Sequence, residues 1–177
     1  NNMFEIYRYL NTTNVSCIEA SPSSGFVSKD GILYSGDTSC LILCPIKKTG
    51  DIIVPEGVTC INDFAFYGTG IDSVTFPSSL KSIRKEAFRQ SKIRKIDFGP
   101  GIEKIGGYAS NIFADCHNLT HVEFPPQVTD IGHSAFLNCR SLKSVTMHKG
   151  ISTIGRRAFA WCEKLKSVTL PKSIKYA

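Results

Sequence analysis

The chain has 177 residues, 42% of which are apolar, and it carries a formal net charge of +6 at pH 7. This length favours one domain, and no apolar run approaches the roughly 20 residues that a membrane-spanning helix needs. The seven cysteines are an odd number, so at least one thiol is unpaired or pairs with another chain.

Residues 1–50 are irregular, and we expect them to form an atypical N-terminal repeat that contains a β-hairpin. Residues 31–44 read "GILYSGDTSCLILC", two apolar segments around a polar turn at Ser35–Thr38. The hairpin precedes the first regular repeat. It would either cover the end of a stack of strands, because an uncovered strand edge invites further pairing, or form an elaborated repeat inside a longer array.

Residues 51–177 contain five copies of one repeat. Its most regular member is a phenylalanine that recurs at intervals of 22, 25, 23 and 23 residues: Phe66, Phe88, Phe113, Phe136 and Phe159. The third copy has three extra residues in the segment "GGYASNI", which must bulge outward if the phenylalanines are to stay aligned. A period of about 23 residues predicts a continuous coil in which each copy stacks on the next.

Each copy contains two local patterns. Alternating apolar and polar residues, as around Leu142, Val145 and Met147, predict a short half-buried strand. The A-F-x-x-C segment that follows the turn is too short for an independent helix, and it predicts a single helical turn. We therefore expect an α+β repeat solenoid of short parallel strands and single helical turns, in one continuous body with the hairpin region.

Three cysteines occupy the same position in the last three copies: Cys116, Cys139 and Cys162. Stacked one coil apart, they would be close enough for a disulfide. We expect them to stay reduced, because equivalent side chains on parallel strands point the same way. A small buried cysteine is a common core residue.

The outward face of the predicted strands is the first candidate binding site. Its charged members, on two neighbouring coils, are Lys95, Asp97, His121 and Glu123. Opposite charges on adjacent coils could neutralise each other, a surface pairing worth roughly 0–1 kcal/mol. The same residues could equally form the centre of a polar protein-binding site, and the sequence leaves both interpretations open.

A second candidate is a basic flank beside this face, formed by Arg94, Arg140, Lys143, Lys164 and Lys166. It belongs to a basic part of the chain, since residues 140–177 hold nine basic and one acidic side chain. An acidic protein, an anionic glycan or plain solvation would each fit such a flank. We do not expect nucleic-acid binding, because the aromatic residues fall at core positions and not among these basic residues.

Residues for catalysis or metal binding are poorly represented. We see no convergent set of acid, base and nucleophile, so an enzyme is not expected. Cys40 and Cys44 lack a second ligand pair at zinc-site spacing, and Cys116 beside His117 falls at a core position. The sequence therefore predicts no metal and no cofactor.

The repeat pattern P-x-x-V-x-x-I-G-x-x-A-F-x-x-C-x-x-L-x-x-V-x-L/F-P closely resembles the BspA-like leucine-rich repeat, and the match covers about residues 17–177. The hairpin segment "SKDGILYSGDTSCLILCP" resembles an element found between such repeats. Two positions depart from the pattern: Ile112 replaces alanine, and His148 replaces the strand-ending proline. The resemblance implies a right-handed leucine-rich-repeat coil of the kind found in surface or secreted proteins of mucosal bacteria and parasitic protists.

Two functional hypotheses follow. The first, which the resemblance favours, is a non-enzymatic module at the cell surface or secreted, which recognises a host protein or another cell-surface ligand through the sheet face and basic flank. The second is a cytoplasmic scaffold that assembles through the ends of its repeats, which reduced cysteines would favour. The sequence does not indicate an oligomeric state.

Overall fold

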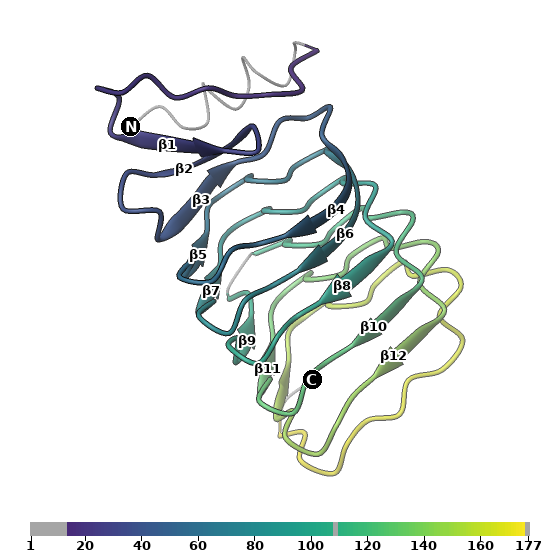
Figure 1. Cartoon of the computed structure of the whole chain (residues 1–177). Helices are drawn as coiled ribbons and strands as arrows, with labels where there is room; N and C mark the ends of the chain where they lie inside the picture. Colours follow the sequence, from purple (N-terminus) through teal and green to yellow (C-terminus); the bar gives the residue numbers. More distant parts are fainter. Residues whose placement is uncertain (1–13, 108–109, 176–177) are drawn as a thin grey trace.

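A computed structural model describes residues 14–107 and 110–175, which form a right-handed β-solenoid of about five turns (Figure 1). Each turn contributes short strands to two rows. The front row contains β4 (Thr49–Ile53), β6 (Gly70–Thr75), β8 (Lys95–Asp97), β10 (His121–Glu123) and β12 (Ser144–Thr146). The side row contains β3 (Cys40–Leu43), β5 (Cys60–Ile61), β7 (Ser82–Ile83), β9 (Lys104–Ile105), β11 (Asp130–Ile131) and β13 (Thr153–Ile154).

The strands within each row are parallel where they pair, as expected for a coil that returns to the same side once per turn. Alternation along the strand places the middle residue of each front strand inward. Val74, Ile96 and Val122 are buried, while their neighbours on both sides are at least partly exposed. The front row thus presents a mostly polar outer face.

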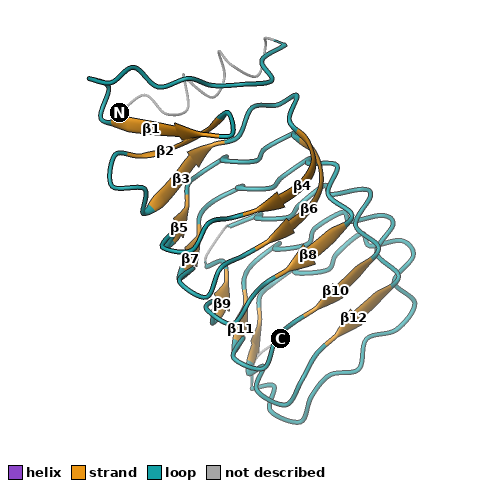
Figure 2. Ribbon diagram, in the orientation of Figure 1, coloured by secondary structure: helices purple, strands orange, loops and turns teal. Residues whose placement is uncertain are grey.

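The N-terminal strands adjoin the first turn of the coil (Figure 2). β1 (Phe26–Lys29) pairs antiparallel with β2 (Ile32–Ser35), β2 pairs antiparallel with β3, and β3 pairs parallel with β5. The turn between β2 and β3 is closed by Asp37, whose Oδ1 accepts hydrogen bonds from the Ser35 hydroxyl at 2.6 Å and the Ser39 amide at 3.0 Å. These bonds, first the one from Ser35, lower the pKa of Asp37 to about 2.

The recurring phenylalanines form one stack through the interior, as their spacing predicts. Centroids of successive rings are 4.6, 5.0, 5.2 and 5.5 Å apart, and the stacked planes differ by at most 23°. The first four rings are fully buried, and Phe159 in the last copy is partly buried. A second column of rings packs edge-on against the first, for example Phe98 on Phe113 at 5.9 Å and 88°. This aromatic double column is the centre of the core.

The expected helical turns are absent, so the α+β assignment was wrong. None of the described residues is helical, and none therefore forms a helix that could span a membrane. Residues on both sides of each A-F pair adopt positive φ, such as Ser134 at 53° and Asn138 at 58°, and a left-handed residue ends a helical turn. Backbone amides bond instead to the next coil, from Phe136 to Ala158 and from Asn138 to Ala160, both at 2.8 Å.

The three repeat cysteines lie in the core with their thiols on backbone carbonyl groups. Cys139 Sγ, for example, lies 3.1 Å from the Phe113 carbonyl oxygen, and burial raises the pKa of the Cys116 thiol to about 12. The two earlier copies have hydroxyls in the same region of the coil: the buried Thr69 donates to the Phe66 carbonyl at 2.8 Å, and Ser91 contacts Cys116.

Both rows of strands are interrupted between the same two coils. In the described part of the chain, β8 does not pair with β10, and β7 does not pair with β9. The A-F segments remain connected there, since the Phe88 amide bonds to the Ile112 carbonyl at 2.8 Å. We call this interruption the seam. It coincides with the long third copy, whose predicted outward bulge lies partly on residues 108–109, outside the described residues.

Candidate functional site

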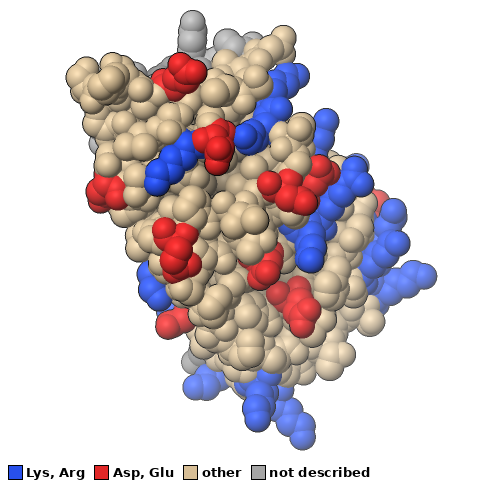
Figure 3. All heavy atoms as spheres, in the orientation of Figure 1, with Lys and Arg blue, Asp and Glu red and all other residues tan. Residues whose placement is uncertain are grey.

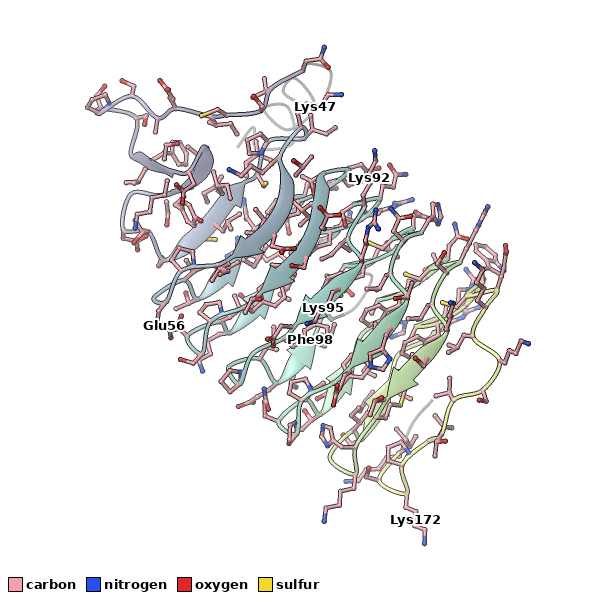
Figure 4. The ribbon with its side chains drawn as sticks, turned by 45° about the vertical axis from the view of Figure 1, so that its right-hand side comes forward. Lys47, Glu56, Lys92, Lys95, Phe98 and Lys172 are labelled. Atoms are coloured by element: carbon pink, nitrogen blue, oxygen red, sulfur yellow. The ribbon has the colours of Figure 1, made fainter. Side chains whose placement is uncertain are left out.

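The four predicted sheet-face residues come from adjacent strands on the two sides of the seam. Lys95, which Figure 4 labels, and Asp97 flank the buried Ile96 on β8, and both are exposed. On β10, His121 and Glu123 flank Val122 in the same way. The structure thus brings together the residues that the sequence assigned to one face.

These charges do not neutralise one another. Among the described residues, no ion pair includes Lys95, Asp97 or Glu123, and the side chains of Lys95 and Glu123 make no hydrogen bond. Asp97 Oδ1 accepts one bond from the Gly99 amide at 3.1 Å, and His121 Nδ1 lies 2.7 Å from Ser144 Oγ. Lys95 and Glu123 are therefore available to a partner.

A groove of about 480 Å³ lies beside these charges, where the seam meets the C-terminal ends of the strands. Its walls combine charged and apolar groups: Lys95, Ile96, Asp97, Phe98, Glu123, Phe124, Pro125, Pro126, Thr146 and His148. The residue that replaces the expected proline, His148, bridges its own turn to the preceding one. Its Nε2 lies 2.6 Å from the Pro125 carbonyl oxygen, and its Nδ1 accepts from the Gly150 amide at 3.0 Å.

The seam also leaves backbone groups free at the groove. The residues that follow β4, β6 and β10 donate to the next coil, as Phe76 does to Asp97 at 2.9 Å and Phe124 to Thr146 at 3.1 Å. The equivalent bond from the Phe98 amide to the Glu123 carbonyl is missing in the described chain. A buried backbone donor without a partner is rare and unfavourable, so this amide can bind an acceptor on a ligand.

The basic flank lies along the margin of the sheet where the front strands begin. Figure 4 labels Lys92 on this margin, and Figure 3 shows Lys and Arg side chains gathered along it. Two of its five members are paired within the chain. Arg94 Nε lies 3.3 Å from Asp72 Oδ1, and Arg140 Nε lies 3.6 Å from Glu163 Oε1. The remaining cations, Lys143, Lys164 and Lys166, make no ion pair among the described residues.

Sequence reasoning missed three features of this surface. Asp72 stands one repeat before Arg94, and that spacing of 22 residues could have revealed their ion pair. Ile53 is 78% exposed on β4, where it pairs in register with Thr75 on the outer face. The free Phe98 amide is a backbone group, and no sequence pattern signals it.

The cysteine and histidine residues that the sequence analysis considered as metal ligands do not come together in one site. Within residues 14–107 and 110–175, no group of three or more His, Cys, Asp or Glu residues is arranged to hold a metal ion. Cys116 is buried in the core, whereas the neighbouring His117 turns its Nδ1 to the Asn138 carbonyl oxygen at 3.1 Å. Cys40 and Cys44 are both free thiols.

Comparison with solved structures finds the same coil in bacterial proteins. A leucine-rich cell surface protein from Faecalibacterium prausnitzii shares 26% identity at a TM-score of 0.76, over 88% of this chain and 40% of its own. The pneumococcal vaccine antigen PcpA shares 20% identity at a TM-score of 0.72, over 93% and 45%. A leucine-rich repeat protein of T. pallidum shares 22% identity at a TM-score of 0.58, over 88% of this chain and 85% of its own.

The chain thus spans less than half the length of the first two proteins. The search of curated proteins gave no match. The family model for the BspA type leucine-rich repeat region matches residues 43–110 and 109–177 with six copies, where the sequence analysis counted five. The chain therefore belongs to the BspA-type leucine-rich repeat family.

Proposed function

We propose that this chain is a non-enzymatic recognition module of a cell surface, and that it binds a protein partner through the groove at the seam. Leucine-rich repeat coils generally bind proteins, and one similar structure is described as a leucine-rich cell surface protein. Family membership supports the class of function. The choice of site rests on the geometry of this chain.

One observation carries that choice: the groove combines unpaired charges with an unpaired backbone group. Within residues 14–107 and 110–175, Lys95 and Glu123 have no ionic partner, and the Phe98 amide lacks the bond that Phe76 and Phe124 make. The nearby Arg94, by contrast, is already paired with Asp72. Binding energy is available where polar groups gain partners, so the groove is a better binding site than the paired charges of Arg94 and Asp72.

The chemistry of the groove fits an extended peptide segment. The adjacent carboxylates of Asp97 and Glu123 suit a basic side chain, and Lys95 suits an acidic one. The apolar walls near Pro125 can take an aliphatic or aromatic side chain. A backbone carbonyl of the peptide would accept from the free Phe98 amide.

The basic flank would make a second, weaker contribution. Its three unpaired lysines would attract acidic segments or an anionic glycan next to the groove. Because exposed charges are screened over about 8–10 Å at physiological ionic strength, this part of the binding should weaken as salt rises. A Lys143→Ser, Lys166→Ser double variant whose binding keeps the wild-type salt dependence would remove the flank from the binding site.

A displayed library of random linear peptides tests the groove directly. We expect enrichment of peptides that combine basic, acidic and apolar residues, with at least tenfold weaker binding to the double variant Lys95→Glu, Glu123→Lys. The matched control Lys172→Glu, Glu103→Lys makes the same exchange at exposed positions that do not line the groove and leaves the net charge unchanged. Peptides that bind both variants as tightly as the wild type would exclude the groove.

A further inference from the structure

A pair of cysteines outside the groove lies side by side on neighbouring strands. Cys40 of β3 and Cys60 of β5 are register partners in a parallel pair. Paired strands lie about 4.8 Å apart, which falls within the Cα separation of about 4.4–6.8 Å that a disulfide spans. Both thiols are free in the structure, and the two sulfurs lie close enough for each thiol to shift the pKa of the other.

This pair differs from the cysteines of the core. Cys40 is only half-buried and Cys60 is 8% exposed, whereas Cys116 and Cys139 have no exposure at all. The core thiols also contact carbonyl oxygens of the preceding coil, such as Cys116 Sγ and the Phe88 oxygen at 3.1 Å. Those bonds turn the core thiols toward the backbone of the preceding coil, whereas Cys40 Sγ has only a 3.9 Å contact with the carbonyl oxygen of Leu41, the next residue on its own strand.

The surroundings of the pair stabilise one thiolate. A hydrogen bond from Cys40, followed by one from Ser82 and the positive charge of Arg84, lowers the pKa of Cys60 to about 6 against the opposing effect of burial. The same contact raises the pKa of Cys40. Cys60 is therefore the more acidic thiol of the pair. The thiolate is the form that attacks disulfides.

Binding of a metal ion is a weaker explanation for the pair. A structural zinc site takes four ligands, usually cysteine or histidine. In the part of the chain that the structure describes, no third His, Cys, Asp or Glu joins these two sulfurs in a metal-binding group. The neighbours of Cys60 are instead a hydroxyl and a guanidinium, which favour thiolate chemistry.

We propose that Cys40 and Cys60 form an intramolecular disulfide when the protein meets a small-molecule disulfide oxidant, and that this bond ties the N-terminal hairpin to the first coil. The Cys60 thiolate attacks the oxidant, forms a mixed disulfide and releases one thiolate of the oxidant. Cys40 then loses its proton to solvent and attacks the Cys60 sulfur, which releases the second. Two protein thiols are oxidised, and one disulfide is reduced to two thiols.

The test is a redox titration with oxidised and reduced glutathione, followed by alkylation and peptide mass mapping. Oxidation should remove two of the seven thiols, and the mapped link should join Cys40 to Cys60 with a loss of two hydrogens. The linked protein should also melt about 5 °C higher than the reduced protein. Because Cys17 is exposed, the titration is repeated in Cys17→Ser to exclude links between molecules.

Single variants and the core pair provide the controls. Cys40→Ser and Cys60→Ser should each abolish the link and leave a glutathione adduct on the remaining cysteine. Cys116 and Cys139, stacked one repeat apart, should stay fully alkylatable under the same conditions after unfolding. The proposal fails if all seven thiols survive excess oxidised glutathione, or if the mapped link joins any other two cysteines. It does not depend on the function of the groove.

Discussion

Truncation of one ring in the phenylalanine stack tests the architecture most directly. Phe136 is fully buried between Phe113 at 5.2 Å and Phe159 at 5.5 Å, and it meets Phe124 edge-on at 5.7 Å. Burial of a phenylalanine side chain contributes about 3 kcal/mol. The lost ring contacts and the remaining cavity add to this. We therefore expect Phe136→Ala to lower the free energy of unfolding by about 4 kcal/mol, within the range of about 3–5 kcal/mol typical of such changes.

The terminal position of the stack gives an internal comparison. Phe159 is partly buried and stacks on Phe136 alone among the described rings. Phe159→Ala should therefore lower the free energy of unfolding by about 2 kcal/mol. Leu170, which is 54% exposed, is the matched control for loss of apolar surface, and Leu170→Ala should change stability by less than about 0.5 kcal/mol.

Urea unfolding followed by far-ultraviolet circular dichroism measures all three variants against the wild type. The denaturant slope must stay constant for the midpoints to report stability. Equal losses for Phe136→Ala and Leu170→Ala would refute the stack, since a ring that contributes no more than an exposed leucine cannot be the centre of the core.

The remaining predictions concern the backbone and pH. Gly101→Ala should lower the free energy of unfolding by more than about 2 kcal/mol, because the added Cβ would lie 2.2 Å from the Ser78 carbonyl oxygen; urea unfolding checks this. Trp161 is 69% exposed with φ at 60°, so Trp161→Asn should raise the urea midpoint by the equivalent of about 0.5 kcal/mol. The pKa of Asp37 falls from 3.8 to about 2 on folding, so its stabilising effect is complete above about pH 4 and disappears as the pH falls toward 2. The melting temperature of Asp37→Asn should therefore change less between about pH 4 and pH 2 than that of the wild type. An unchanged pH dependence would contradict the role of the Ser35 hydrogen bond.

The repetition in the sequence predicted the coil because its determinants recur at a fixed interval. Phe66, Phe88 and their later counterparts keep their spacing, and burial of one implies burial of all. The outward positions of Lys95 and Glu123 followed from strand alternation alone. Both inferences rest on residue spacings within or between repeats, and these spacings can be read from the sequence without knowledge of the structure.

The helical turns were mispredicted because no residue type signalled the left-handed positions. Glu86, Arg157 and Trp161 adopt positive φ, although glycine and asparagine are the residues that usually do so. The hydrogen bonds between coils stabilise that conformation, and they are contacts between residues more than 20 positions apart. Intrinsic preference of short segments therefore gave the wrong answer.

The candidate site was predictable only in part for the same reason. The charged residues were visible in the sequence, but the groove beside them depends on the interrupted pairing of β8 with β10. The three extra residues of the third copy were also visible. The loss of pairing between β8 and β10 depends on how neighbouring coils align in space, and the order of residues along the chain does not show that alignment.

The seam has a mechanical consequence for the rod. Coupling between neighbouring units sets how cooperatively a repeat protein unfolds, and at this junction backbone hydrogen bonds connect the coils through the A-F segments but not through either strand row. The aromatic core crosses the seam, so the blocks before and after it should still unfold together, but bending should concentrate at that joint. A ligand that grips Lys95 on one block and Glu123 on the other would act as a splint, and hydrogen exchange near the joint should slow when it binds.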